Sequence, residues 1–279
     1  MSEIRIIPVR GLPEVPAGAD VAALILQAAR PQPDILPGDI VVVTQKIVSK
    51  AEGRVVSLAD VTPSAQAERL AIATEKDPRL VELILRESRA IVRQRGPVLI
   101  TETRHGFVCA NAGIDASNVG PEGLVSLLPE DSDASAAAIR AKIAERTGAE
   151  VAVIISDTFG RAWREGHTNV AVGVAGMLPF ADYVGQVDRH GYELRVSTLA
   201  VADELAGAAE LVMGKLDQVP VAIVRGYAYP RGEGAARQIV RDGRGTCSGS
   251  YSMSLTELNA DSESEAPNRP PLTPDISEA

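Results

Sequence analysis

Several features are scarce in this sequence, and each scarcity argues against a class of protein. Only two cysteines, Cys109 and Cys247, occur among 279 residues, too few for a disulfide framework. No run of about 18 apolar residues occurs, so no membrane-spanning helix is expected. The N-terminal residues MSEIRIIPVR lack the long apolar segment of a signal peptide, which makes the cytoplasm the expected location.

Aromatic residues make up only 3% of the chain, whereas hydrophobic residues make up 45%. That fraction suffices for a folded core, which must be built mainly from Ala, Val, Ile and Leu. The formal net charge of −9 argues against non-specific binding to nucleic acid or to an anionic membrane, because such binding depends on Lys and Arg. An anionic substrate stays open, since a local cluster of backbone N–H groups, lysines and metal can outweigh the global charge.

Standard nucleotide and catalytic motifs are also missing. Neither a P-loop nor a Rossmann glycine pattern between strand and helix is present, so a nucleotide site here must be of another kind. The histidines His105, His167 and His190 do not have the spacing of a His-Glu-x-x-His zinc site. No Gly-x-Ser-x-Gly elbow occurs, which leaves serine acyl transfer of that type without support.

The apolar pattern predicts helices and strands that interleave along the chain. Helices are predicted at 20–30, 64–74, 77–93, 134–147 and 199–213, with Asp20 and Asp77 as candidate N-caps. Strands are predicted at 4–9, 40–44, 97–101, 106–110, 151–157, 170–175, 192–198 and 219–225. This order indicates an α/β or mixed α+β fold.

The composition changes near residue 241. Gly, Ser and Arg dominate first, and residues 256–279 then carry many acids and four prolines. Such a composition cannot bury enough apolar area to offset its ordering entropy. We therefore expect one folded domain over residues 1–240 and a disordered tail over 241–279.

The segment ISDTFGR, residues 155–161, places polar groups directly after an apolar strand. Asp157 and Thr158 offer a carboxylate and a hydroxyl beside Gly160 and Arg161. This combination at the carboxyl end of a strand suits a hard cation and a phosphate. From spacing alone, the alternative that Asp157 caps a turn or a helix stays open.

Two further segments have the composition of a metal and phosphate site. NAGIDASN, residues 111–118, offers the carboxylate of Asp115 among Asn, Ser and Gly and can ligate Mg²⁺ or Mn²⁺, although an Asx-turn accounts for the same residues. TQKIVSKAEGR, residues 44–54, supplies lysines for phosphate or carboxylate groups. Taken alone, this second segment also fits a solvated basic turn.

Together with other motifs, these segments make the sequence resemble the coenzyme F420-0:L-glutamate ligase family. The matching stretches, in the family's order, are PVRGLP (8–13), VVVTQKIVSKAEGR (41–54), NAGIDASN (111–118), ISDTFGR (155–161), GHTNVAVGVAG (166–176), VADELAGAAELVMGK (201–215) and VPVAIVRG (219–226). The resemblance implies a homodimer with a family-specific mixed α/β fold, in which nucleotide binds in a groove between two subdomains.

The resemblance also implies a reaction. GTP phosphorylates a carboxylate of coenzyme F420-0, and the amine of L-glutamate then attacks the acyl phosphate to form an amide. Later rounds add γ-linked glutamates. Mg²⁺ or Mn²⁺ is the implied metal cofactor, and K⁺ is a further candidate. A carboxylate is a poor electrophile, and phosphorylation gives it a good leaving group, so cations near the phosphates fit this chemistry.

Carried over position by position, the resemblance assigns the site residues. Asp115 and Asp157 would bind a first divalent metal and Thr158 a second, and the two aspartates with Lys50 form the expected catalytic group. The expected nucleotide contacts are Gly11, Leu12, Pro13, Gln45, Lys46, Lys50, Asn118, Leu211, Val212, Met213, Gly214, Lys215, Leu216, Asp217 and Gln218.

Lys215 departs from the family pattern, because archaeal members carry a metal-binding acid or amide after Met-Gly. A protonated lysine cannot ligate a cation but can contact a phosphate, so Lys215 is a candidate replacement for part of the second metal's charge. Two other functions stay open. One is an enzyme of the same fold that acts on another carboxylate, and the other is a GTP-binding regulatory protein without catalysis.

Overall fold

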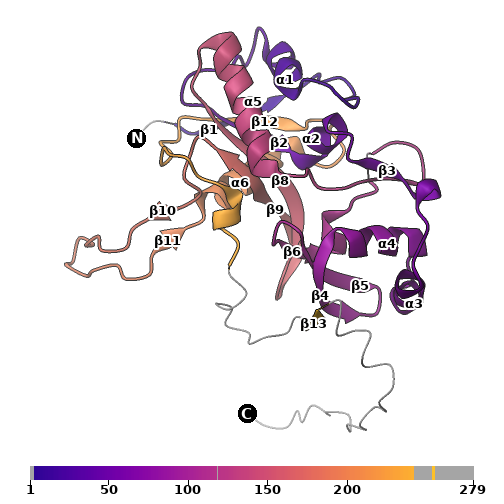
Figure 1. Ribbon diagram of the computed structural model, residues 1–279. Coiled ribbons are helices and arrows are strands. Elements are labelled where there is room, and N and C mark those ends of the chain that lie inside the picture. Colours follow the sequence, from indigo (N-terminus) through magenta and orange to yellow (C-terminus); the bar gives the residue numbers. More distant parts are fainter. Residues whose placement is uncertain (1–2, 118, 242–252, 255–279) are drawn as a thin grey trace, which may run out of the picture.

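A computed structural model describes residues 3–117, 119–241 and 253–254 of the chain. A five-stranded sheet with helices on both faces forms the larger part, and a second group of helices and strands lies beside it (Figure 1). This arrangement confirms the predicted mixed α/β fold. The predicted tail lies outside the described residues, except for Arg241 and the short strand β13 (Met253–Ser254).

The large sheet brings together strands from both ends of the chain. Its strands, in spatial order, are β1 (Arg5–Val9), β12 (Val221–Arg225), β2 (Ile40–Thr44), β8 (Ala152–Arg161) and β9 (Arg164–Ala175). Only β2 and β8 are parallel neighbours, and the other pairs in this sheet are antiparallel. The carboxyl ends of β2 and β8 therefore lie side by side, with Thr44 opposite Ser156.

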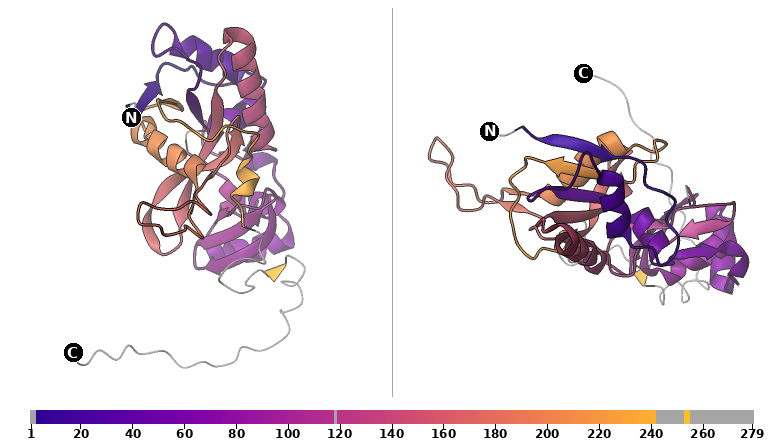
Figure 2. Two further views of the ribbon diagram at one scale, coloured as in Figure 1. Left: turned by 90° about the vertical axis from the view of Figure 1, so that its left-hand side faces the viewer. Right: turned by 90° about the horizontal axis from the view of Figure 1, so that it is seen from above.

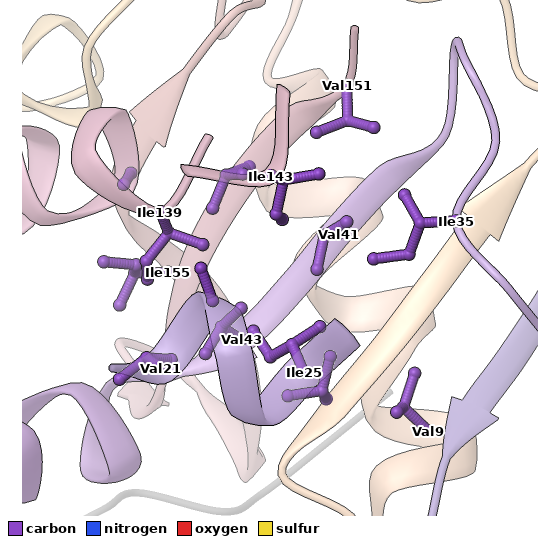
Figure 3. Close-up of a cluster of buried hydrophobic side chains, with 14 of the residues drawn as sticks. Val9, Val21, Ile25, Ile35, Val41, Val43, Ile139, Ile143, Val151 and Ile155 are labelled. Atoms are coloured by element: carbon purple, nitrogen blue, oxygen red, sulfur yellow. The ribbon is translucent and has the colours of Figure 1, made fainter. Parts of the chain in front are cut away.

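Alternating residues of these strands fill two cores. One face packs against α1 (Val21–Ala29) and α5 (Ser132–Thr147), and the other against α6 (Val201–Met213) (Figures 1 and 2). Residues toward α1 and α5 include Val41, Val43 and Ile155 (Figure 3). Val153 belongs to the same cluster. Residues toward α6 include Ile40, Val42, Ala152 and Ile154. Because both faces are covered, the strands read as nearly continuous apolar runs, and each fully buried Val or Ile contributes about 1.5–3 kcal/mol.

Local signals fix the ends of several helices where the sequence predicted them. The side chain of Asp20 accepts a hydrogen bond from Ala23 N at 3.2 Å and so begins α1. α5 ends at Thr147 and is capped by Gly148, whose φ of 71° favours glycine. No helix was predicted within the lysine-bearing segment 44–54, whereas the structure has helix α2 (Gln45–Ala51) directly after β2.

The second group is built from short elements between β2 and β8. Its helices are α3 (Ala65–Thr74) and α4 (Pro78–Arg86), with the 3-10 turns η1 (Leu58–Asp60) and η2 (Asn111–Gly113). Its strands are β3 (Val55–Ser57), β4 (Ser88–Arg95), β5 (Val98–Thr103), β6 (Val108–Ala110) and β7 (Leu124–Ser126). β3 pairs with β7, and the second sheet has the order β13-β4-β5-β6. The predicted strands at 97–101 and 106–110 are thereby confirmed as neighbours.

Two predicted elements are wrong. The helix predicted over 77–93 ends at Arg86, because residues 88–95 pair with β5 as strand β4 and the hydroxyl of Ser88 donates to Ile84 O at 2.6 Å. The strand predicted over 192–198 is absent apart from Thr198, the first residue of β11 (Thr198–Leu199), which pairs with β10 (Ala181–Asp182). The residues between these two strands form a projecting arm, visible at the left of Figure 1.

The described helices also bear on membrane insertion. None of the helices within the described ranges is long and apolar enough to cross a membrane.

The last 3-10 turn, η3 (Ala236–Gln238), contributes the buried Ala236 to the core under α6.

Candidate functional site

A cavity of about 660 Å³ opens at the carboxyl ends of β2 and β8. In open α/β sheets, ligands bind outside the carboxyl ends of strands, and a cavity of this volume accommodates a nucleotide-sized ligand. The lining residues are Leu12, Pro13, Glu14, Val15, Thr44, Lys46, Ile47, Lys50, Ser117, Val119, Gly120, Thr158, Asn169, Glu210, Met213, Gly214, Lys215, Leu216, Gln218, Val219 and Pro220. Both α2 and α6 thus contribute to its wall.

Helix α2 directs two lysines into this cavity. Lys46 and Lys50 are four residues apart, so they lie on one face of the helix. The Lys46 ammonium donates to Asp115 Oδ2 at 2.8 Å and to Ser117 O at 2.7 Å, and Lys50 forms an ion pair with Glu14. Their side chains are only 17% and 11% exposed, which excludes the alternative of a solvated basic turn.

Asp115 is fixed by backbone and side-chain hydrogen bonds. Its backbone exchanges two hydrogen bonds with Ser126, at the end of β7. Its carboxylate accepts from Ser117 N at 2.7 Å and from Ser117 Oγ at 3.0 Å. Burial raises the pKa of Asp115, but the Lys46 ammonium and the Ser117 donors outweigh burial, so the pKa lies below its usual value. Asp115 is therefore a stable carboxylate.

Asp157 lies on β8 directly after a register shift between Ile155 and Ser156. Such a bulge re-aims the side chains that follow it. Burial raises the pKa of Asp157 to about 7, and the negative charge of Asp115 adds to the rise. The backbone N–H of Thr158 and the ammonium groups of Lys46 and Lys215 oppose it. The charge of Asp115 therefore acts on Asp157, although the two residues are far apart in the sequence.

The two carboxylates fit a divalent cation. Within the described parts of the chain, no lysine or arginine forms an ion pair with Asp157, and the charges of Lys46 and Lys215 offset only part of the rise in its pKa that burial causes. The described residues contain no group of three or more His, Cys, Asp or Glu able to hold a metal. This is compatible with Mg²⁺, which commonly uses one or two carboxylates together with water and substrate phosphates.

A second set of hydrogen bonds surrounds Thr158. The Lys215 ammonium contacts Thr158 Oγ1, and the Thr158 hydroxyl donates to Asn169 Oδ1 at 2.7 Å. Asn169 Nδ2 in turn donates to Glu210 Oε2 at 2.9 Å, and Glu210 Oε1 lies 3.7 Å from Lys215 Nζ. Sequence reasoning assigned no role to Asn169 and Glu210, although both lie in motifs that it quoted, at 166–176 and 201–215.

The other predicted nucleotide contacts divide into two sets. Those that line the cavity are Leu12, Pro13, Lys46, Lys50, Met213, Gly214, Lys215, Leu216 and Gln218. Five described residues of the predicted set do not line it, namely Gly11, Gln45, Leu211, Val212 and Asp217. Gln45 is 1% exposed and its side-chain oxygen accepts from Ser49 Oγ at 2.7 Å, whereas Leu211 is 82% exposed. Asn118 lies outside the described residues.

Cys109 lies near these groups but takes no part in thiolate chemistry. Burial raises its pKa to about 12, and the negative charge of Asp157 acts in the same direction. A thiol with this pKa stays protonated near neutral pH, so it is neither a nucleophile nor a metal ligand there.

Comparison with known proteins gives a consistent result. The sequence model described as F420-0:Gamma-glutamyl ligase matches residues 11–226. A protein named coenzyme F420:L-glutamate ligase from Methanothermobacter thermautotrophicus is 51% identical over 242 residues, which cover 85% of this chain and 96% of the relative. Proteins of the same name from Methanopyrus kandleri and Methanocaldococcus jannaschii are 46% and 42% identical, covering 85% and 86% of this chain and 94% and 96% of the relatives.

The family match spans well over half of the chain, and it includes both aspartates, the two lysines of α2 and the end of α6. Members of this family are ligases that form an amide bond. The chain belongs to the F420-0:gamma-glutamyl ligase family.

Proposed function

We propose that this protein is a GTP-dependent and divalent-metal-dependent ligase that adds L-glutamate to coenzyme F420-0 in coenzyme F420 biosynthesis. The proposal is supported by relatives named coenzyme F420:L-glutamate ligase and by the chemistry of the cavity wall. The observation that carries it is the meeting of Asp115, Asp157 and Lys46 in one electrostatic group beside a nucleotide-sized cavity.

Activation of the acceptor is the first step of the proposed reaction. The carboxylate oxygen of the acceptor bonds to the γ-phosphorus of GTP, the bond from that phosphorus to the bridging oxygen breaks, and GDP leaves. Asp115 and Asp157 would hold the divalent cation, whose positive charge would neutralise part of the triphosphate. Lys46, Lys50 and Lys215 line the cavity and would contact phosphate oxygens, where fixed cations stabilise the charge that moves during transfer.

Amide formation is the second step. The neutral amine of L-glutamate attacks the acyl carbon, the carbon–oxygen bond to phosphate breaks, and inorganic phosphate leaves. The amine gives up one proton, so the products are the amide, phosphate and GDP. Each further round would extend the product by one γ-linked glutamate.

One assay tests this function directly. The purified protein is incubated with F420-0, GTP, L-glutamate and Mg²⁺ or Mn²⁺, with and without K⁺, and the products are analysed by mass. The expected product is F420-0 with added glutamate, formed together with GDP. A reaction with ATP in place of GTP is the nucleotide control, and omission of the metal is expected to abolish turnover.

The same assay separates the two alternatives. Release of GDP without a glutamylated F420-0 product would identify an enzyme that acts on another carboxylate. Binding of GTP with no turnover under any metal condition would identify a regulatory protein. Neither alternative accounts for the 51% identity to a coenzyme F420:L-glutamate ligase as simply as the proposed reaction does.

We also propose that the protein acts as a homodimer in the cytoplasm. Exposed apolar side chains on the projecting arm support self-association, since Val187, Tyr192 and Val196 are 63%, 64% and 90% exposed. Sedimentation of the purified chain is expected to give twice the mass of one chain, and a single-chain mass at micromolar concentration would contradict the dimer.

A further inference from the structure

The strongest feature without an assigned role is the closed set of contacts among Lys215, Thr158, Asn169 and Glu210, here called the Lys215 ring. Its members come from β8, β9 and the end of α6, and all four line the cavity. Each contacts the next, and Glu210 Oε1 completes the ring 3.7 Å from Lys215 Nζ. β8 and α6 therefore supply the direct partners of the ammonium group, and Asn169 of β9 links these two partners.

Asn169 sets the direction of the hydrogen bonds in this ring. Its amide oxygen takes the one hydroxyl proton of Thr158, so a lone pair of Thr158 Oγ1 is free to accept from Lys215. Its amide nitrogen occupies Glu210 Oε2, which leaves Oε1 as the oxygen that faces Lys215. Asn169 is 4% exposed, so its own position is fixed by packing.

The ring differs from an ordinary surface salt bridge. The Lys215 side chain is 64% exposed, and a lysine this open usually samples many conformations. Here the Thr158 hydroxyl accepts a hydrogen bond from its ammonium and Glu210 forms an ion pair with it, and the ammonium charge also acts on Asp157. The ammonium thus lies close enough to Asp157 for its charge to act on that carboxylate, and it lines the cavity that would hold the nucleotide.

We propose that Glu210 and Asn169 are positioning residues that hold the Lys215 ammonium as a fixed cation for the terminal phosphate of the nucleotide. The inference rests on the proposed function for the identity of the nucleotide. A preset cation costs little reorganisation when negative charge shifts onto the phosphoryl oxygens, which is the source of its effect on transfer. Lys215 would contact the substrate, whereas Glu210 and Asn169 act through Lys215.

Direct binding of GTP and GDP to the purified full chain with Mg²⁺ tests this inference without using the ligase reaction. For Lys215→Ala, GTP affinity is expected to fall about tenfold and GDP affinity less than twofold, because only GTP has the terminal phosphate. Glu210→Gln keeps the shape of the side chain but removes its charge. It is expected to lower the affinity for GTP by about three- to fivefold and to leave the affinity for GDP nearly unchanged. Asn169→Ala is expected to behave in the same way.

Two matched controls accompany these variants. Glu204→Gln removes an exposed acid on the first turn of α6, and Lys142→Ala removes a lysine on α5. Neither lines the cavity, so both are expected to keep wild-type affinities. Melting temperatures show whether each variant is folded, and Glu210→Asp is expected to restore part of the selectivity for GTP.

Addition of ethylammonium gives a second readout. It is expected to restore part of the GTP affinity of Lys215→Ala, because the ring acceptors remain, and to have no such effect on the Lys215→Ala/Glu210→Gln double variant. Equal GTP affinities for wild type, Lys215→Ala and Glu210→Gln would overturn the inference. Failure of the F420-0 assay with normal, ring-dependent binding of GTP would instead count against the proposed function alone.

Discussion

Two corners at the edge of the cavity contain the same kinds of group and hold them differently, with Asp115 and Asp157 set behind the residues that line it. The first corner has Asp115, Ser117 and Lys46, and the second has a carboxylate, a hydroxyl and an ammonium in Asp157, Thr158 and Lys215. In the first corner the ammonium contacts the carboxylate directly, at 2.8 Å. In the second, the ammonium contacts the hydroxyl instead.

Differences in burial and in pairing together account for the opposite pKa shifts of the two aspartates. The pKa of Asp115 lies below its usual value although the residue is partly buried, because Lys46 and Ser117 stabilise the carboxylate. Burial and the neighbouring charge of Asp115 raise the pKa of Asp157 to about 7. The protein already supplies a positive partner to Asp115, whereas under the proposed function Asp157 would gain its positive partner when a cation binds.

Removal of the Asp157 charge is expected to lower turnover more than any change in the other corner. In Asp157→Asn, the amide has the shape of the carboxyl group but only one carboxylate remains for the cation. We expect turnover to fall about 10²–10³-fold, the range typical for loss of one key electrostatic group. Glutamylated product measured by mass gives the rate, and Asp60→Asn, an exposed acid on η1, is the matched control.

Lys46→Met tests the first corner in the same way. Without the ammonium, Asp115 and Asp157 become two carboxylates with less positive charge near them, and the pKa of Asp115 is expected to rise. We expect turnover to fall about tenfold to a hundredfold, somewhat less than for Asp157→Asn, because the cation ligands remain. Lys142→Met is the control, and wild-type turnover in Lys46→Met would remove the proposed role of this corner.

The pH dependence of metal affinity distinguishes the two carboxylates. A proton competes with the cation at Asp157 below about pH 7, so Mg²⁺ or Mn²⁺ affinity is expected to fall by up to about tenfold per pH unit there. Calorimetric titration of the protein with the metal, at several pH values between 5.5 and 8, measures this affinity. Asp115→Asn should keep a pH dependence of this kind at lower affinity, whereas Asp157→Asn should lose it. An affinity that does not change over this range would contradict the assignment.

The same group affects stability when no metal is present. Because the pKa of Asp157 in the folded protein lies above its usual 3.8, the folded state binds a proton that the unfolded chain releases. This contribution to the free energy of unfolding is full below about pH 4 and is lost as the pH rises toward about 7. Chemical denaturation of wild type and Asp157→Asn in chelator should show the wild type losing stability relative to the variant over that window.

The smallest expected effect comes from Ser117→Ala. The substitution removes the hydroxyl that donates to Asp115 Oδ2 at 3.0 Å, but the backbone N–H of Ser117 and the Lys46 ammonium remain. We expect a decrease in turnover of about twofold to threefold, consistent with the loss of one partly exposed hydrogen bond. A decrease as large as that of Lys46→Met would show that the hydroxyl has a further role.

The sequence was most informative where local rules decide the structure. The apolar run at 40–44 and the N-cap Asp20 predicted β2 and the start of α1, because these signals act within a few residues. The helix predicted over 77–93 failed after Arg86, since pairing with β5 outweighs the helical pattern of the following residues. Strand pairing depends on distant residues, which a local pattern does not include.

The same contrast between local signals and distant contacts applies to the residues of the site. Family motifs identified Asp115, Asp157 and Lys46, and the structure brings their charges together. Asn169 and Glu210 were missed because their roles arise from the register of β8 with β9 and from the packing of α6 beside them. Neither feature has a signature in the spacing of the sequence.

A structure of the protein with Mn²⁺ and a non-hydrolysable GTP analogue, located by the anomalous scattering of manganese, tests the central claim most directly. We predict one ion between the carboxylates of Asp115 and Asp157, with metal–oxygen distances near those of Mg²⁺, about 2.1 Å, and phosphate oxygens completing its coordination. An ion bound away from these residues, or bound by only one of the two carboxylates, would contradict the account.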